Sequence, residues 1–168
     1  MNHVDRILEQ WGRVRPDLDV TPMGLTGRLK RISRILEREM ESVFADHGLN
    51  LASFDVLATL LRSGEPFQLS PGELIANSMV TSGTMTNRID QLVKGGLVER
   101  VPNPDDGRSV HIALTKKGKR LIDRAIEDHV ENLHRLTGGL SENAFSKLDR
   151  LLDQYLDTLE RGDCSVNL

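Results

Sequence analysis

Three arginines in the middle of the chain have the clearest capacity for chemistry. Arg88 falls in a stretch with helical spacing of apolar residues, Arg100 in a run of β-type residues, and Arg108 after a turn rich in Pro, Asn, Asp and Gly. A guanidinium group presents a planar fork of N–H donors that matches phosphate and carboxylate oxygens. The chemistry that these residues predict is therefore anion binding.

No combination of nucleophile and base points to an enzyme. The histidines are scattered, and the two nearest, His129 and His134, are five residues apart and do not stack on one helix face. The two glycines after Lys94 are typical of a helix end, not of a phosphate loop. The sequence therefore predicts no catalytic residue, no metal ligand and no cofactor. The role of the single cysteine, Cys164, stays open.

The composition is that of a soluble globular protein. The chain has 168 residues, of which 38% are hydrophobic and 28% charged. No apolar run approaches the length of a membrane span, and the N-terminus lacks a signal-peptide core. One cysteine in a polar tail excludes a disulfide framework. We therefore expect a cytoplasmic protein with no membrane partner.

The net charge of −3 hides an uneven distribution. Residues 81–124 hold 9 basic and 5 acidic residues, whereas residues 125–168 hold 4 basic and 9 acidic residues. A local basic segment, not the net charge, is what attracts phosphates. The middle of the chain is therefore the candidate for nucleic-acid binding.

Hydrophobic periodicity and capping residues predict a mainly α chain (α+β) with one hairpin. Ser70 and Glu73 have the spacing of a capping box around Pro71, and Thr21 before Pro22 predicts another helix start. Helices are expected over residues 3–14, 22–45, 51–62, 71–76, 82–94, 116–137 and 142–160, with a two-stranded hairpin over 98–114. A short helix, a turn, a helix and a hairpin, in that order, are the layout of a winged helix-turn-helix.

The helix over residues 82–94 has a polar face suited to a DNA major groove. Its apolar residues fall within one arc, and its other face carries small and hydrogen-bonding side chains. A solvated surface helix is the alternative, but the position between a capped short helix and a hairpin favours recognition. The predicted DNA-binding residues are Ser70, Ser82, Thr84, Thr86, Asn87, Gln91 and Arg108.

Residues from about 25 to 160 resemble the MarR family of winged-helix transcription regulators. The stretch "GLVERVPNPDDGRSVHIALTKKG" is similar to the wing signature of that family, with Asp106 two residues before Arg108. The resemblance implies a homodimer that binds double-stranded DNA at a palindromic promoter site. Each helix over 82–94 would enter the major groove, and each Arg108 the minor groove. Asp106 would hold the guanidinium in one rotamer.

The last helix carries an apolar seam that favours an intertwined dimer. Phe145, Leu148, Leu152, Tyr155 and Leu159 step by three and four residues. Packing within one chain is the alternative. We expect N-terminal helices over 1–48, a winged helix-turn-helix over 49–118 and C-terminal dimerisation helices over 119–168.

Four further residues predict a ligand site: Trp11, Asp55, Arg88 and Arg100. A carboxylate such as Asp55 in an apolar helix is costly to bury without a partner. Each residue also has a structural alternative: an anchor for Trp11, an ion pair for Asp55 and phosphate contacts for the arginines. Their positions resemble the urate- and purine-responsive branch of the MarR family, which implies a small anionic aromatic effector that releases the protein from DNA.

Two other functions stay open at this stage. The first is a MarR-type regulator that responds to phenolic or other carboxylates, and the second is a winged-helix module that binds proteins. The sequence does not distinguish a repressor from an activator, although a ligand-released repressor is the expectation.

Overall fold

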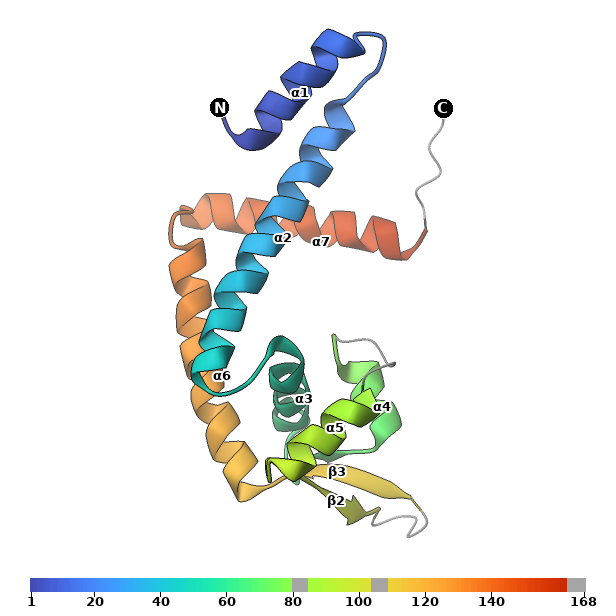
Figure 1. The fold of residues 1–168 in the computed structure, drawn as a ribbon, viewed down its shortest axis with the longest axis vertical. Helices are drawn as coiled ribbons and strands as arrows, with labels where there is room; N and C mark the ends of the chain where they lie inside the picture. The colour runs from blue at the N-terminus through green and yellow to red at the C-terminus, as the bar shows by residue number, and fades with distance from the viewer. Residues whose placement is uncertain (80–84, 104–108, 163–168) are drawn as a thin grey trace. The chain divides into compact units, whose positions relative to one another are not determined.

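The structure is a computed structural model that describes residues 1–79, 85–103 and 109–162. The chain divides into two compact units, Met1–His129 and Val130–Leu168. The elements in chain order are α1 His3–Val14, α2 Thr21–Asp46, α3 Leu51–Arg62, β1 Gln68–Leu69, α4 Pro71–Asn77, α5 Met85–Lys94, β2 Val98–Pro102, β3 Val110–Leu114, α6 Lys116–Thr137 and α7 Glu142–Glu160 (Figure 1). This is the mainly helical fold with a small sheet that the sequence predicts.

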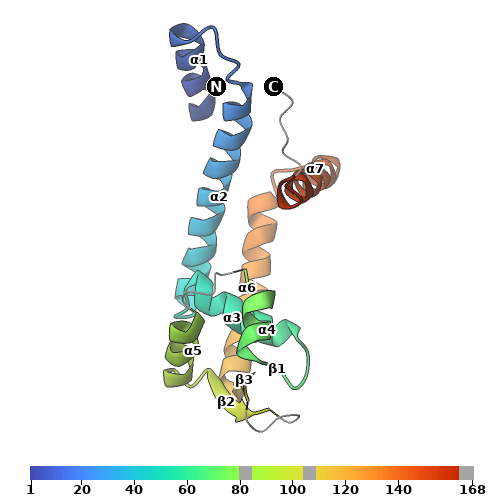
Figure 2. The same cartoon turned by 90° about the vertical axis from the view of Figure 1, so that its right-hand side faces the viewer.

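Helix α1 packs on the N-terminal part of α2 (Figure 2). Val4 is buried in this contact, and Gly24 and Gly27 of α2 let the side chains of α1 approach closely. An ion pair joins Arg28 Nη2 to Asp5 Oδ1 at 2.6 Å. The capping-box hydrogen bond with Asn2 and the guanidinium of Arg28 both lower the pKa of Asp5. Helix α1 is therefore held on α2 by local contacts.

The start of α2 differs slightly from the prediction. Val20 occupies the N-cap position in place of Thr21, and no side chain caps the helix from there. The carboxylate of Asp19 accepts a hydrogen bond from the backbone N–H of Thr21 at 2.9 Å instead. Pro22 lies in the first turn, as expected from its missing N–H.

The hydrophobic core of the first unit lies where α3, α4, α5 and the sheet meet near the C-terminal end of α2 (Figures 1 and 2). Every apolar residue that the periodicity of α5 places on its inner face contributes to this core. The fully buried large side chains include Phe44, Leu57, Leu60, Leu74, Met85, Val98, Ile112 and Ile122. The core thus fixes α4 and α5 against α3.

The sheet has three antiparallel strands in the order β1-β3-β2. In the hairpin, Arg100 pairs with Ile112 and Pro102 with Val110. The third strand, β1, pairs Gln68 with Ala113 and corrects the expectation of a two-stranded ribbon. A strand of two residues is too short to show an alternating pattern, so the sequence gives no signal for it.

Helix α6 begins against the turn that follows α5. Thr115 donates its hydroxyl to the carbonyl of Gly96 at 2.7 Å and accepts the backbone N–H of Gly118 at 2.9 Å. Gly118 is buried with its Cα against the backbone of Leu97, where a Cβ would overlap the Leu97 carbonyl oxygen. The helix start and the wing are therefore locked together through backbone contacts.

The second unit contains the end of α6 and the whole of α7. Ser141 caps α7 by accepting the backbone N–H of Ala144 at 3.3 Å. No residue of α7 is buried. Among the described residues, no helix is long and apolar enough to cross a membrane.

Candidate DNA-binding surface and ligand site

The capping box at the start of α4 forms as the sequence predicts. The hydroxyl of Ser70 accepts the backbone N–H of Glu73 at 3.2 Å, and Glu73 Oε2 accepts the backbone N–H of Ser70 at 2.8 Å. The Ser70 side chain, and to a lesser extent the Ser70 backbone N–H, lower the pKa of the Glu73 carboxyl group through hydrogen bonds. Ser70 is thus engaged in fixing the direction in which α4 leaves β1, and its contact with DNA stays a prediction.

Helix α5 presents one buried and one exposed face. Met85, Ile89 and Leu92 are between 1% and 4% exposed, as the helical spacing predicts. Thr86, Asn87 and Gln91 are exposed, so their side chains are accessible to a DNA groove. Ser82, Thr84 and Arg108 lie outside the described residues.

The base of the wing is held by hydrogen bonds between Asn103 and Ser109. The backbone N–H of Asn103 donates to the Ser109 carbonyl at 3.0 Å, and Asn103 Nδ2 donates to Ser109 Oγ at 2.8 Å. These bonds join the ends of the two wing strands, β2 and β3, at the last residues described on either side of the gap.

Arg100 lies at the surface and pairs with the helix α5. Its Nη2 is 2.6 Å from Asp90 Oδ1, and both side chains are close to half exposed. Strand alternation places Arg100 on the same face as Val98, which is buried, yet Arg100 itself is exposed. Asp90 was not predictable as its partner, because strand alternation does not say which helix residue lies beside a strand.

Asp55 is buried on α3 with 8% of its surface exposed. Its Oδ2 accepts the backbone N–H of Met79 at 2.8 Å. Met79 follows α4 and precedes α5, so the carboxylate ties α3 to the turn of the helix-turn-helix. The expectation that this carboxylate needs a partner is met by a backbone group. Arg88 is half-buried on α5, and its role in a ligand site stays a prediction.

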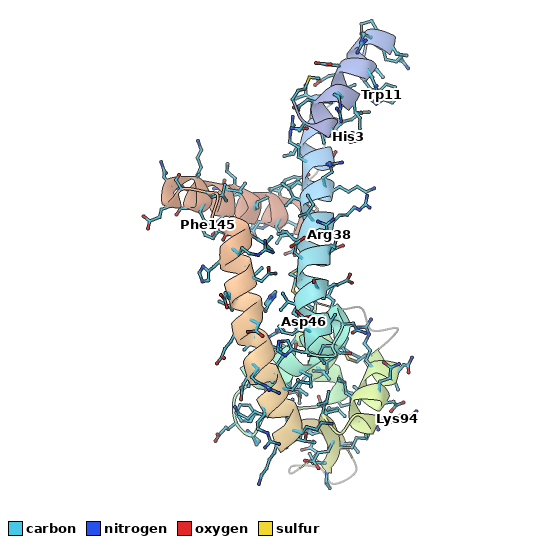
Figure 3. The ribbon with its side chains drawn as sticks, turned by 60° about the vertical axis from the view of Figure 1, so that its left-hand side comes forward. His3, Trp11, Arg38, Asp46, Lys94 and Phe145 are labelled. Atoms are coloured by element: carbon cyan, nitrogen blue, oxygen red, sulfur yellow. The ribbon has the colours of Figure 1, made fainter. Side chains whose placement is uncertain are left out.

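Trp11 does not approach the other three candidate ligand residues within one chain. It lies on α1 and is 39% exposed. In Figure 3, Trp11 is at the α1 end of α2, whereas Lys94 marks the C-terminus of α5 at the other end. The structure therefore brings Asp55, Arg88 and Arg100 to neighbouring elements but leaves Trp11 apart.

The described residues contain no group of three or more His, Cys, Asp or Glu side chains that could hold a metal ion. The exposed side chains of α5 and the guanidinium of Arg100 offer hydrogen-bonding and cationic groups. They suit binding to an anion or to a base edge.

Comparison with known proteins gives a consistent result. Residues 47–109 match the sequence profile of the MarR family. The transcriptional regulator PecS of Dickeya dadantii is 41% identical over 149 residues, which are 89% of this chain and 90% of PecS. The transcriptional repressor YetL of Bacillus subtilis is 30% identical over 90% of this chain and 80% of its own length.

A solved structure adds a DNA complex to these relatives. It is a cysteine-to-serine mutant of MarR from Escherichia coli bound to operator DNA. The TM-score is 0.69 and the sequence identity 25%, over 87% of this chain and 97% of that chain.

Proposed function

Because the chain belongs to the MarR family of DNA-binding transcription regulators, we propose that it is a homodimeric, ligand-released repressor that acts in the cytoplasm. The observation that carries this proposal is the exposed polar face of α5 beside the wing. Thr86, Asn87 and Gln91 are exposed there, while the other face of α5 is buried in the core. The family consists of transcription regulators and not enzymes.

In the proposed complex, α5 enters the major groove of a palindromic promoter site and the wing follows the neighbouring minor groove. Asn87 and Gln91 offer hydrogen bonds to base edges, and Arg108 offers a cation to the narrow groove. Ser70, Ser82, Thr84 and Thr86 complete the contact set, mainly at phosphates. Two copies of α5 reach two half-sites only if the dimer holds them one helical turn of DNA apart.

The DNA-binding proposal is tested by fluorescence anisotropy with the DNA upstream of the chain's own gene. Affinity should fall steeply with salt, because bound phosphates release counterions. The R108A variant should bind more weakly, whereas R13Q, an exposed charge change on α1, should bind like the unmodified protein. A winged-helix module that binds proteins alone would show no salt-dependent binding to this DNA.

The homodimer proposal rests on apolar surface without a cover within each unit. Helix α2 exposes Met23, Leu25, Ile32 and Ile35. Helix α7 exposes Phe145, Leu148, Leu151, Leu152, Leu156 and Leu159. Basic residues surround the first set, with Arg31, Arg34 and Arg38 around one hollow, and acidic residues such as Asp149 and Asp153 lie on α7. These two exposed apolar stripes favour a second copy of the chain as the partner.

The proposed effector is a small anionic aromatic molecule such as urate or a related purine. Asp55, Arg88 and Arg100 belong to α3, α5 and β2, so an anion near the two guanidinium groups would act on the elements that bind DNA. Trp11 would offer an indole for stacking, from the partner subunit if the dimer brings it there. The effector would shift α5 and so change the half-site spacing.

Titration of the protein–DNA complex with urate, xanthine and salicylate tests the effector. A purine should release the DNA at millimolar levels, and D55A and R100Q should need more purine than the unmodified protein. Release by salicylate and not by purines would favour a regulator of phenolic acids. Equal release in D55A would contradict the proposed coupling.

A further inference from the structure

An ion pair joins helix α5 to the wing at the protein surface. Arg100 Nη2 of β2 donates to Asp90 Oδ1 of α5 at 2.6 Å, and the two side chains are 44% and 45% exposed. An exposed ion pair of this kind adds little to the stability of a fold. The role of the pair is therefore better sought in what α5 and the wing do together.

The pair lies where one face of the sheet passes from the core to the surface. Arg100 follows the buried Val98 by two residues and is paired across the hairpin with the buried Ile112, so all three share a face. Helix α5 packs against β2, which is an outer strand of the described sheet. The long side chain of Arg100 therefore leaves the core beside α5.

Asp90 is the one acidic residue of α5, and it lies among the polar residues of that helix. It is three residues after Asn87 and directly before Gln91, both of which are exposed. A carboxylate repels the phosphates of DNA, so an acid at this place weakens DNA binding unless a cation neutralises it. Arg100 supplies that cation.

In the proposed complex with DNA, a phosphate strand passes over this pair. A major groove and the minor groove beside it are separated by one sugar–phosphate strand. If α5 occupies the major groove and the wing the minor groove, that strand crosses the line along which α5 meets β2. Asp90 and Arg100 lie on this line.

We propose that Asp90 is a positioning residue that holds Arg100 ready for a phosphate of this strand. A guanidinium has five N–H donors, and the bond to Asp90 Oδ1 uses one of them, so a phosphate oxygen can accept from another. An arginine that is already held in one rotamer loses less conformational entropy when it binds.

This inference rests on the proposed function and adds Arg100 to the proposed DNA contacts. Arg100 also belongs to the proposed effector residues. A phosphate and an effector anion would then be alternative occupants of the same guanidinium.

The phosphate contact is measured by fluorescence anisotropy with promoter DNA and with a scrambled duplex of equal length, over a range of salt concentrations. R100M should weaken binding to both duplexes by a similar factor, and the slope of log K against log salt should become shallower by about 0.9, the value for one phosphate. R100K keeps the charge and should keep the slope. R15Q should change neither quantity, although it breaks an exposed ion pair of the same 2.6 Å length, with Asp17.

The positioning role is tested by D90N and D90A, which both lack the charge but differ in whether an oxygen accepts from Arg100. D90A should bind both duplexes about three- to fivefold more weakly than D90N. In the R100M background, D90N and D90A should bind equally, because the acceptor has no arginine to hold. Thermal denaturation checks the fold, and the midpoint of each single variant should move by less than about 4 °C.

The outcomes for the pair and for the proposed function are distinct. An R100M slope equal to that of the unmodified protein, or equal affinities of D90A and D90N while Arg100 is present, would overturn the inference and leave the regulator standing, because the unmodified protein still binds its promoter. An unmodified protein that binds no promoter DNA would contradict the proposed function and remove this inference with it.

Discussion

Asp55 shows how a single unfavourable residue marks a structural joint. A carboxylate is a poor choice for an apolar helix, and burial without a partner would cost several kcal/mol. Its acceptance of the Met79 N–H, at 2.8 Å, gives the carboxylate a hydrogen bond and ties α3 to the residues directly after α4. Burial and the proposed function meet at this residue, because the bond lies within the helix-turn-helix.

Replacement of Asp55 by Ala should lower the free energy of unfolding by about 1–3 kcal/mol, since the hydrogen bond between the Met79 N–H and a carboxylate is lost. D55N should lose less, because the amide oxygen still accepts this hydrogen bond. Urea denaturation monitored by circular dichroism measures both. The exposed Asp46 provides the control, and D46A should stay within about 0.5 kcal/mol of the unmodified protein. Equal losses in D55A and D55N would contradict the role of the acceptor.

The residues of the candidate site were predictable to different degrees. The helical spacing of α5 placed Thr86, Asn87 and Gln91 on the exposed face, because a period of 3.6 residues alone decides that face. The pair of Asp90 and Arg100 was not predictable, since it depends on how a strand turns back along a helix. The bond between Asp55 and a backbone group carries no side-chain signal in the sequence at all.

At the scale of elements, the junction of α5, the wing and α6 explains why the stretch after the hairpin contains a threonine and a glycine. The "LTKKG" stretch places a threonine at the cap of α6 and a glycine three residues later. The hydroxyl of Thr115 joins Gly96 to Gly118, and Gly118 lies directly against the backbone of Leu97. Glycine is needed there for close approach of two backbones, not for an unusual backbone angle.

A methyl group at position 118 should therefore destabilise the fold. G118A forces apart α6 and the turn after α5, and we expect a loss of about 1–3 kcal/mol or more in the free energy of unfolding. The change is measured by denaturation, with G72A on α4 as the control. A Cβ at Gly72 meets nothing within 4 Å, so G72A should be neutral or stabilising by about 1 kcal/mol. Equal stability of the two variants would refute the contact.

The helices were predictable from sequence to within a few residues, because most of them combine a clear apolar period with a capping residue. The short strand β1 was not predictable, and the N-cap of α2 shifted by one residue. The strand depends on a partner far along the chain, β3, and the shifted cap goes with the local hydrogen bond that Asp19 accepts from the Thr21 N–H. Periodicity does not report either.

Three aromatic side chains join α2, α3 and α6 in one corner. Phe44 and Phe54 stack with ring centres 4.0 Å apart, and the ring of His129 lies 5.1 Å from each. Burial lowers the pKa of His129 below its ordinary value of 6.5. His129 Nδ1 is shielded from solvent and has no hydrogen-bond partner among the residues that the structure describes. The neutral imidazole is therefore the form that the corner accepts.

The free energy of unfolding should decrease as the pH drops below about 6.5 and His129 is forced to take up a proton. The unfolded chain binds a proton on His129 near pH 6.5, whereas the folded chain binds it only at lower pH, so the contribution present above 6.5 is lost as the pH falls through the folded pKa. H129Q should show a smaller loss of urea midpoint between about pH 7.5 and 5.5. H134Q, an exposed change on α6, should keep the full dependence, and an unchanged slope in H129Q would refute the assignment. H47Q is measured in parallel, because His47 contacts Asp128 in the same corner.

On the scale of the whole molecule, the positive and negative charges are divided between the middle and the C-terminal part of the sequence. The positive segment over residues 81–124 contains α5 and the wing, and the negative segment over residues 125–168 contains α7. The negative segment disfavours contact with DNA. The apolar stripe on α7 is therefore available for a protein partner, and the proposed partner is a second copy.

The apolar stripe on α7 predicts that the chain sediments as a dimer, at twice its mass of 18.8 kDa. A single charge placed in that stripe should dissociate the dimer. L152E places a carboxylate at the centre of the stripe, where a dimer would have to bury it without a cation. Analytical ultracentrifugation should show that L152E is monomeric, with dimer forming only at higher protein concentration. Q154E, which adds the same charge beside polar residues of α7, should remain a dimer. Circular dichroism checks that both variants keep their helices. A folded L152E that stays dimeric would place the dimer interface elsewhere.

If L152E is monomeric, its affinity for a palindromic site should fall toward that for a single half-site, since two copies of α5 no longer bind as one body.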